Sequence, residues 1–361
     1  MVFFGRRATY CYFRAILLYA GDRITAEIII FGDDMSQTTP DQLATPAAPA
    51  QQQSGTATMW STLNVEPERR DVGDDIVRHI VAPLSAQAKT WGGYRFGFTR
   101  NLESNHPSVQ LHLSATDAVV ERVWTSAHAL TEECRMRLGP VTLSRQPDII
   151  YPPRPGEPLS ERMESSFARF GGLAGLQLIG DISELSSDLA LWAVNRFPSP
   201  NMRSILASLL LFDTAHAMMR GPRSNSWPDR RTTSWDFYWN AHLHACTVSF
   251  GPVAEHARKA MLARMAPRIM PTHRVMAALA SEPSVDLWRR RWAQAIDLYL
   301  YRADKQRISR SAQHLTMAAS RLLMNRLGFP LREEATLGQY AHAWSKDLEA
   351  QYSGKASAHS G

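Results

Sequence analysis

Apolar residues recur at helical spacing through most of the chain after residue 158. Intervals of three and four residues between apolar positions are typical of a helix that covers a core with one face. No repeat of fixed period is present, so the pattern does not indicate a solenoid. The predicted helices span residues 159–170, 172–194, 200–220, 232–250, 252–266, 284–304 and 308–328.

The preceding stretch, residues 59–150, has a mixed pattern. Val109, Leu111 and Leu113 alternate with polar residues, which predicts a strand with one face on a core. The predicted elements of this stretch are helices at 74–88 and 116–138 and strands at 94–98 and 108–114. The fold class predicted for the chain is therefore α+β, with a small mixed α/β layer followed by a predominantly helical portion.

The chain divides at segments that are poor in large apolar side chains. Residues 35–58 are mainly Pro, Ala, Gln, Ser and Thr, which cannot bury enough surface to offset their ordering entropy and predict a disordered linker. The residues before it are either a short appendage or an upstream extension, with Met35 as the initiator. The predicted organisation is an extension and linker at 1–58, one domain at 59–350 (α+β part 59–150, helical part 151–350, beginning with the Pro-rich connector 151–158) and a disordered tail at 351–361.

Composition narrows the class of protein. With 44% hydrophobic and 20% charged residues, the chain has the make-up of a water-soluble globular protein. No apolar run reaches the ~18 residues of a membrane span, and arginines interrupt the apolar start, so no signal peptide is predicted and the cytoplasm is the expected location. The three cysteines are widely spaced, which predicts neither a disulfide framework nor a zinc site.

The net charge of +6 favours an acidic partner. Nucleic acid and an acidic peptide both fit such an excess, and a merely solvated basic face is the alternative. No helix-turn-helix pattern supports nucleic acid, so an acidic peptide is the preferred partner.

The most aromatic segment is SWDFYWNAHLHAC, residues 234–246. At helical spacing, Trp235, Tyr238, His242 and Cys246 lie on one face. Such a stripe is typical of a core, but a phenol and an imidazole one turn apart also suit acid–base chemistry beside a substrate. His242 and its neighbour His244 diverge by about 200° on a helix, so this pair is not predicted to bind a metal.

The predicted helix 284–304 carries Trp288, Trp292 and Tyr299 on one side. Asp297 and Tyr301 lie on the other side. This polar side is either solvated or lines a groove, and the two tyrosines are candidates for a direct chemical role.

In the predicted helix 308–328, His314, Arg321 and Asn325 share one stripe. Arg326 falls on the apolar flank, where a guanidinium must be paired or must face a wet cleft. Two interpretations therefore stay open for Arg326: a structural side chain bonded to carbonyls, or part of a catalytic groove.

Common catalytic and nucleotide-binding motifs are missing from the sequence. It has no Walker loop and no G-x-G-x-x-G, G-x-S-x-G or H-E-x-x-H pattern. GGLAG (171–175) looks like a phosphate loop but follows no predicted strand, so a turn that opens a helix is predicted there.

Three segments stand in a fixed order: PSVQLHLS (107–114), ARFGGLAGLQLI (168–179) and MNRLGF (324–329). They resemble the landmark motifs of the lanthipeptide-dehydratase C-terminal domain, which read approximately P-H-L-R-L-R-L, E-x-x-R-Y-G-G and H-M-x-x-N-R-L. This glutamate-elimination domain also occurs free-standing in thiopeptide-type bacteriocin gene clusters. The resemblance covers roughly residues 59–345 and implies the fold of that domain.

The chain departs from the family motifs at the positions that carry the elimination chemistry. In the family, strand arginines and a helix histidine move protons and expel glutamate from a glutamylated serine. Here Gln110 and His112 replace the strand arginines, and Arg321 replaces the histidine. Ser166 replaces the acidic residue of the second motif, whereas Arg169 is kept. The resemblance therefore implies the scaffold without this elimination machinery.

Thiopeptide pyridine synthases form a branch of the same superfamily that keeps the scaffold with another chemistry, and the chain resembles them in standing alone at about this length. They carry out a formal aza-[4+2] cycloaddition of two dehydroalanines, with loss of water and of the leader peptide, which closes a macrocycle. The resemblance implies this reaction here, with no cofactor and no metal. Its partners would be a modified, azole-bearing precursor peptide and other enzymes of the gene cluster, with no role for nucleic acid or a membrane. Two alternatives stay open: the glutamate-eliminating partner of a split dehydratase, and a non-catalytic scaffold that binds the precursor.

The expected site residues follow from this reaction. The acid and base are expected among Tyr238, His242, Tyr299, Tyr301, Ser309 and His314. Arginines would orient carbonyls or stabilise oxyanion character, and aromatic rings would pack on flat thiazoles. The expected substrate-binding residues are Gln110, His112, Arg169, Trp235, Trp288 and Arg321, with Asn325 and Arg326 at the floor of the groove.

Overall fold

The computed structural model of the protein describes residues 58–361, apart from 103–106, 148–160, 227–229, 231 and 359–361. The predicted extension, nearly all of the predicted linker and the Pro-rich connector lie outside these residues. The rest belongs to one unit that runs from Thr56 to the end of the chain.

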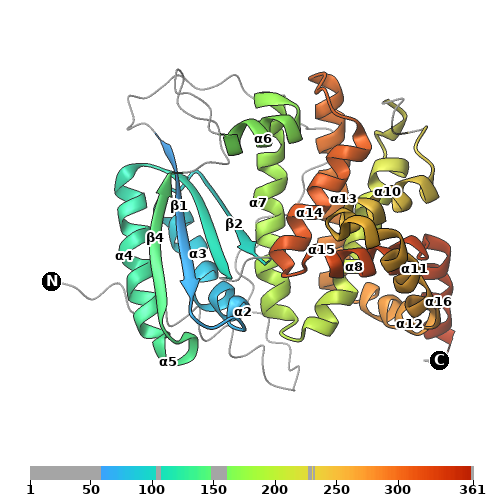
Figure 1. The fold of residues 1–361 in the computed structure, drawn as a ribbon, viewed down its shortest axis with the longest axis horizontal. Coiled ribbons are helices and arrows are strands. Elements are labelled where there is room, and N and C mark those ends of the chain that lie inside the picture. The colour runs from blue at the N-terminus through green and yellow to red at the C-terminus, as the bar shows by residue number, and fades with distance from the viewer. Residues whose placement is uncertain (1–57, 103–106, 148–160, 227–229, 231, 359–361) are drawn as a thin grey trace. The chain divides into compact units, whose positions relative to one another are not determined.

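An antiparallel sheet of four strands forms the first part of this unit (Figure 1). Its order is β2-β3-β1-β4, and β2 is an edge strand. The predicted strands are confirmed as β2 and β3, whereas the sequence analysis did not predict β1 and β4. The strands are β1 (Met59–Pro67), β2 (Arg95–Asn101), β3 (Ser108–Ala115) and β4 (Val141–Pro147).

The two faces of the sheet differ in polarity. Leu63, Phe98 and Leu111 lie on the face that packs into the hydrophobic core. On the opposite face, Thr62 pairs with His112 across the sheet. Helices cover the apolar face: α2 (Gly73–Ile76), a π-helical turn η1 (Val77–Val81), α3 (Ala82–Thr90), α4 (Asp117–Glu133) and α5 (Arg135–Leu138).

Helices make up the rest of the unit, as the sequence predicts (Figure 1). The long helices α7, α8, α13 and α14 pack on one another, and α7 and α14 also contact strand β2. The helices are α6 (Glu161–Phe170), α7 (Gly172–Arg196), α8 (Pro200–Arg220), α10 (Trp235–Thr247), α11 (Ala254–Met265), α12 (Ile269–Ala280), α13 (Pro283–Lys305), α14 (Ala312–Leu327), α15 (Leu331–His342) and α16 (Lys346–Ala358), with 3₁₀ turns at Ser224–Ser226, Val248–Val253 and Ala266–Arg268.

Local chemistry explains several boundaries. Gly171 and Gly172 have φ angles of 80° and 90°, which favour glycine, and α7 begins there, so GGLAG does open a helix. Helix α14 begins only at Ala312, because the Ser311 side chain accepts a hydrogen bond from the His314 backbone and caps it.

The apolar spacing did not predict α12, α15 and α16, and one expectation about the helical part is wrong. Helix α16 continues through residues 351–358, where a disordered tail was expected. Ala, Lys and Gln in this stretch are good helix formers, and the preceding turn is tied to α13 by Glu349. Among the described residues, no helix is long and apolar enough to cross a membrane.

Candidate functional site

The Asn-Arg pair of α14 closes the open edge of the sheet. Asn325 accepts a hydrogen bond from the backbone N–H of Arg100 (2.9 Å) and donates one to its carbonyl (2.7 Å). Arg326 donates to the carbonyl of Phe98 (2.7 Å), and the Ser187 hydroxyl accepts from the Phe98 N–H (3.3 Å). These side chains satisfy backbone groups that an edge strand otherwise exposes.

Arg326 is an interior residue. Its side chain is 1% exposed and also donates to the hydroxyls of Ser183 (2.6 Å) and Ser186 (2.8 Å) on α7. A buried guanidinium needs acceptors of this kind. The structural interpretation of Arg326 therefore holds, and the expectation that it forms the floor of a substrate groove is corrected.

A pocket lies between α7 and α13, lined in part by Tyr299. The Tyr299 hydroxyl is buried and has no hydrogen-bond partner among the described residues. Burial raises the pKa of this phenol, so it stays protonated at neutral pH and can donate a hydrogen bond. The other lining residues are Leu178, Asp181, Ile182, Ala295, Leu298 and Arg302.

Charged residues connect this pocket to the sheet. Asp181 accepts hydrogen bonds from Arg95 of β2 (2.8 Å) and from Arg302 of α13 (3.2 Å). Gly180 makes this possible, because a Cβ there would lie 2.6 Å from the Arg95 guanidinium. Burial raises the pKa of the nearby Glu184. The pocket therefore has apolar walls and a charged rim, with Tyr299 among its lining residues.

On the polar face of the sheet, His112 is held between two threonines. Its Nδ1 lies 3.1 Å from the Thr62 hydroxyl, its Nε2 lies 3.0 Å from the Thr99 hydroxyl, and the residue is 2% exposed. The expected contact of His112 with a substrate is therefore corrected, because both ring nitrogens already have partners. Gln110 is half-buried on the same face and stays a candidate.

The aromatic stripe of α10 meets α14 and α15. His242 Nε2 lies 3.2 Å from Glu334 Oε1, and Arg321 donates to Glu334 Oε2 at 2.8 Å. Burial alone would raise the pKa of Glu334, but His242 and Arg321 hold it below its ordinary value. Tyr238 is 1% exposed, and burial raises its pKa. Tyr238, His242 and Cys246 are buried, as the core interpretation of this stripe predicts.

Three other expected site residues, Arg169, Ser309 and His314, lie near the C-terminal end of α6. His314 Nε2 lies 2.9 Å from the carbonyl of Arg169. Arg310 donates to the carbonyl of Ala168 (2.6 Å), and Ser309 adjoins the Gly171 turn. Side chains of this type satisfy the free carbonyls at a helix C-terminus. His314 therefore caps α6, whereas the exposed Ser309 and Arg169 stay free to meet a peptide.

The remaining candidates lie apart from Tyr299. Tyr301 is half-buried, with Arg223 and Lys305 over its ring. Trp235 donates to the carbonyl of His342 (2.8 Å). Trp288 packs against Trp192. Of the expected acids and bases, Tyr299 is the one that lines a pocket between the long helices.

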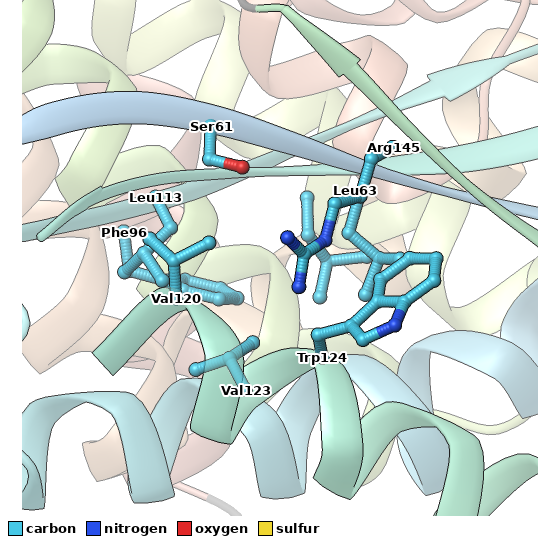
Figure 2. Close-up of a pocket in the computed structure, with 9 residues that line it drawn as sticks. Ser61, Leu63, Phe96, Leu113, Val120, Val123, Trp124 and Arg145 are labelled. Atoms are coloured by element: carbon cyan, nitrogen blue, oxygen red, sulfur yellow. The ribbon is translucent and has the colours of Figure 1, made fainter. Parts of the chain in front are cut away.

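A second pocket lies on the apolar face of the sheet (Figure 2). Figure 2 shows Trp124 and Arg145 side by side at one end of it, and the Arg145 guanidinium lies 4.6 Å from the Trp124 ring centre. Arg145 also pairs with Glu121 of α4 (2.6 Å). This pocket is a gap between sheet and helix within the core, so we assign it no role in binding.

Sequence reasoning missed the partners that organise these regions. Arg95, Asp181 and Glu334 each join elements far apart in the chain. No local pattern marks them, because their partners lie 13 to 121 residues away.

The sequence model of the lantibiotic biosynthesis dehydratase C-terminal domain matches residues 60–344. The chain belongs to this family. The match confirms the resemblance based on three short motifs. No curated protein matches the chain.

Solved structures show the same fold at low sequence identity. The pyridine synthase TbtD from thiomuracin biosynthesis is 18% identical (TM-score 0.53), and the match covers 82% of this chain and 99% of TbtD. TsrL is 15% identical (TM-score 0.54), with 82% and 96% covered. The tRNA-dependent lantibiotic dehydratase MibB from Microbispora sp. 107891 is 16% identical (TM-score 0.52), and the match covers 84% of this chain but 29% of MibB. The chain thus has nearly the full length of the first two proteins and corresponds to one part of the third.

Proposed function

We propose that the chain forms the central six-membered nitrogen ring of a thiopeptide. Two dehydroalanines of an azole-bearing precursor peptide would combine in a formal aza-[4+2] cycloaddition that forms two ring bonds. Loss of water and of the leader peptide as a carboxamide would then give the aromatic pyridine. The observation that carries this proposal is that Gln110, His112 and Arg321 stand where the family motif has its strand arginines and its helix histidine.

These positions do not suit glutamate elimination. That reaction needs cations to hold glutamate and a base to remove a proton. Gln110 is neutral, and His112 is held between Thr62 and Thr99. Arg321 pairs with Glu334, and a guanidinium cannot act as a base in a protein. Elimination at this site would therefore lack the strand cations and the base.

Cyclisation makes demands that the α7–α13 pocket can meet. Orienting two alkenes can supply about 7–11 kcal/mol of a barrier. One dehydroalanine must react as its iminol, and a positioned acid adds about 10²–10⁴-fold to such a proton transfer. In the proposal, the Tyr299 phenol donates to the amide oxygen that becomes the iminol hydroxyl. The apolar walls would hold an azole ring, and Asp181 and Arg302 would bond to peptide groups at the rim.

One set of incubations tests the proposal against the two alternatives. The purified chain is given a linear azole peptide with two dehydroalanines and a leader, and the products are weighed by mass spectrometry. If the chain is a cyclase, the peptide loses the mass of water and of the leader, which is released as a carboxamide. An eliminase would instead release free glutamate from a glutamylated peptide, and a scaffold would bind the precursor and leave its mass unchanged.

A further inference from the structure

Three buried side chains bring ligand atoms to one point between α10 and α15. Nε2 of His242 lies 3.2 Å from Oε1 of Glu334 and 3.7 Å from Sγ of Cys246. All three atoms lie within 4.8 Å of one another. His242 and Cys246 are one helical turn apart on α10, and Glu334 comes from the first turn of α15.

This arrangement is not that of a proton relay. In a relay, the acid and the thiol bind opposite nitrogens of the imidazole. Here both face Nε2, whereas Nδ1 has no partner among the described residues. Gly338 leaves room for this side of the ring, because a Cβ there would lie 2.8 Å from Nδ1. Convergence of three ligand atoms at one nitrogen suits a bound cation.

Two of the three separations lie near those between the ligands of a tetrahedral ion. Bonds of about 2.0–2.1 Å to nitrogen and oxygen and about 2.3 Å to sulfur give edges of roughly 3.3–3.6 Å between ligand atoms. The observed 3.2 Å and 3.7 Å lie close to these edges. Imidazole, thiolate and carboxylate together are ligands that zinc prefers.

We propose that His242, Cys246 and Glu334 bind one Zn²⁺ ion, with water at the fourth position. On binding, the Cys246 S–H bond breaks, the proton goes to solvent, and a zinc–thiolate bond forms. Thiolate and carboxylate then balance the charge of the ion. Arg321 on Oε2 of Glu334 would orient the ligand carboxylate. The ion would link α10 to α15, and this proposal does not depend on the reaction that the chain catalyses.

Cobalt titration of the purified full chain tests the site. Co²⁺ replaces Zn²⁺ in such sites and gives a thiolate-to-cobalt charge-transfer band in the near ultraviolet. We expect one equivalent of Co²⁺ to produce this band and Zn²⁺ to abolish it. Zn²⁺ should also raise the melting temperature of the wild type, because it binds only the folded chain.

Matched variants complete the test. Cys246→Ser and His242→Gln should lose the band and the zinc-induced thermal shift, with circular dichroism reporting whether each is folded. His244→Gln, on the exposed face of α10, and Cys134→Ser should keep both. A folded wild type that takes up neither ion overturns the proposal, as does uptake that Cys246→Ser leaves unchanged.

Discussion

Among the described residues, the buried carboxylate of Asp297 is paired with two arginines. Asp297 was expected on a solvated or groove-lining side of α13, yet it is 1% exposed and binds Arg230 (2.7 Å) and Arg223 (2.9 Å). The expectation was wrong because the arginines that neutralise Asp297 lie 67 and 74 residues away. The buried hydroxyl of Tyr299 has no partner among the described residues, and Tyr299 also lines the α7–α13 pocket.

Replacement of Tyr299 by Phe separates activity from stability. The variant should lose about 10²–10⁴-fold in kcat, because the proposed acid is gone. Its free energy of unfolding should be unchanged or higher, since a buried unpaired hydroxyl is removed. Turnover of the dehydroalanine peptide and urea unfolding measure the two effects. Tyr94→Phe, at an exposed tyrosine, is the control and should change neither. Full activity of Tyr299→Phe would remove the residue from the mechanism.

At the scale of elements, α14 fastens the sheet to the helices. Asn325 and Arg326 bind the edge of β2, and Arg100 of that strand donates back to the carbonyl of Arg326 (2.9 Å). Asp74 forms ion pairs with both Arg100 (Nη1 to Oδ1, 2.7 Å) and Arg203 (Nη2 to Oδ2, 2.6 Å). Burial opposes the ionised form of Asp74, but these two arginines hold its pKa below the ordinary value.

Asn325→Ala should weaken this junction. Two bonds to the β2 backbone are lost, which leaves a partly buried N–H and carbonyl unpaired at about 1–3 kcal/mol each. The matched control is Asn195→Ala, because the Asn195 amide bonds only within its own helix. Urea unfolding should show a clear loss in the free energy of unfolding for Asn325→Ala and a loss of less than about 1 kcal/mol for Asn195→Ala. Equal losses would mean that Asn325 does not hold the edge.

The attachment of α16 should depend on pH. Burial opposes ionisation of Glu349, but Arg289 and Lys346 lower its pKa to about 2. A carboxyl with a lowered folded pKa stabilises the fold above its unfolded value of about 4.3 and loses this contribution as pH falls toward the folded value. Hydrogen exchange should therefore show α16 opening between about pH 4.5 and pH 2. In Glu349→Gln this pH dependence should be absent, and an unchanged profile would contradict the assignment.

The sequence predicted the helices and strands whose apolar residues recur at a regular spacing. It did not predict features that depend on contacts with distant parts of the chain. Alternation in 108–114 correctly placed Leu111 on the core, and the apolar spacing of 308–328 correctly predicted α14. Strand β1 was missed although Leu63 and Val65 alternate with Thr62 and Asn64, because this alternation includes only two large apolar residues. Glu334 was missed because its role depends on His242, 92 residues earlier.

Over the whole molecule, unpaired cations gather on α11, the turn after it and α12. Among the described residues, the side chains of Arg264, Arg268 and Arg274 are exposed and no ion pair holds them. Leu262 and Met270, at 43% and 52% exposure, belong to the same stretch. Exposed apolar side chains among cations suit an acidic amphipathic segment, and the proposed reaction brings a leader peptide to the enzyme.

Charge reversal tests this surface. The triple variant Arg264→Glu, Arg268→Glu, Arg274→Glu should bind an acidic leader peptide at least about tenfold more weakly at low salt. The difference should shrink at about 1 M salt, where charges are screened over roughly 3 Å. Fluorescence anisotropy of a labelled leader peptide measures the binding at low salt and at high salt. The control, Arg70→Glu with Arg307→Glu, alters exposed arginines elsewhere and should bind like the wild type. Equal weakening in both would indicate a general effect of net charge.

The mass of the product shows whether the chain catalyses the proposed cyclisation. A linear azole peptide with two dehydroalanines is incubated with the chain beside a matched peptide in which alanine replaces one of them. We predict that only the first peptide loses water together with a leader carboxamide, and that its product absorbs as a pyridine. Release of free glutamate from a glutamylated peptide, with both dehydroalanines of the first peptide left intact, would contradict it.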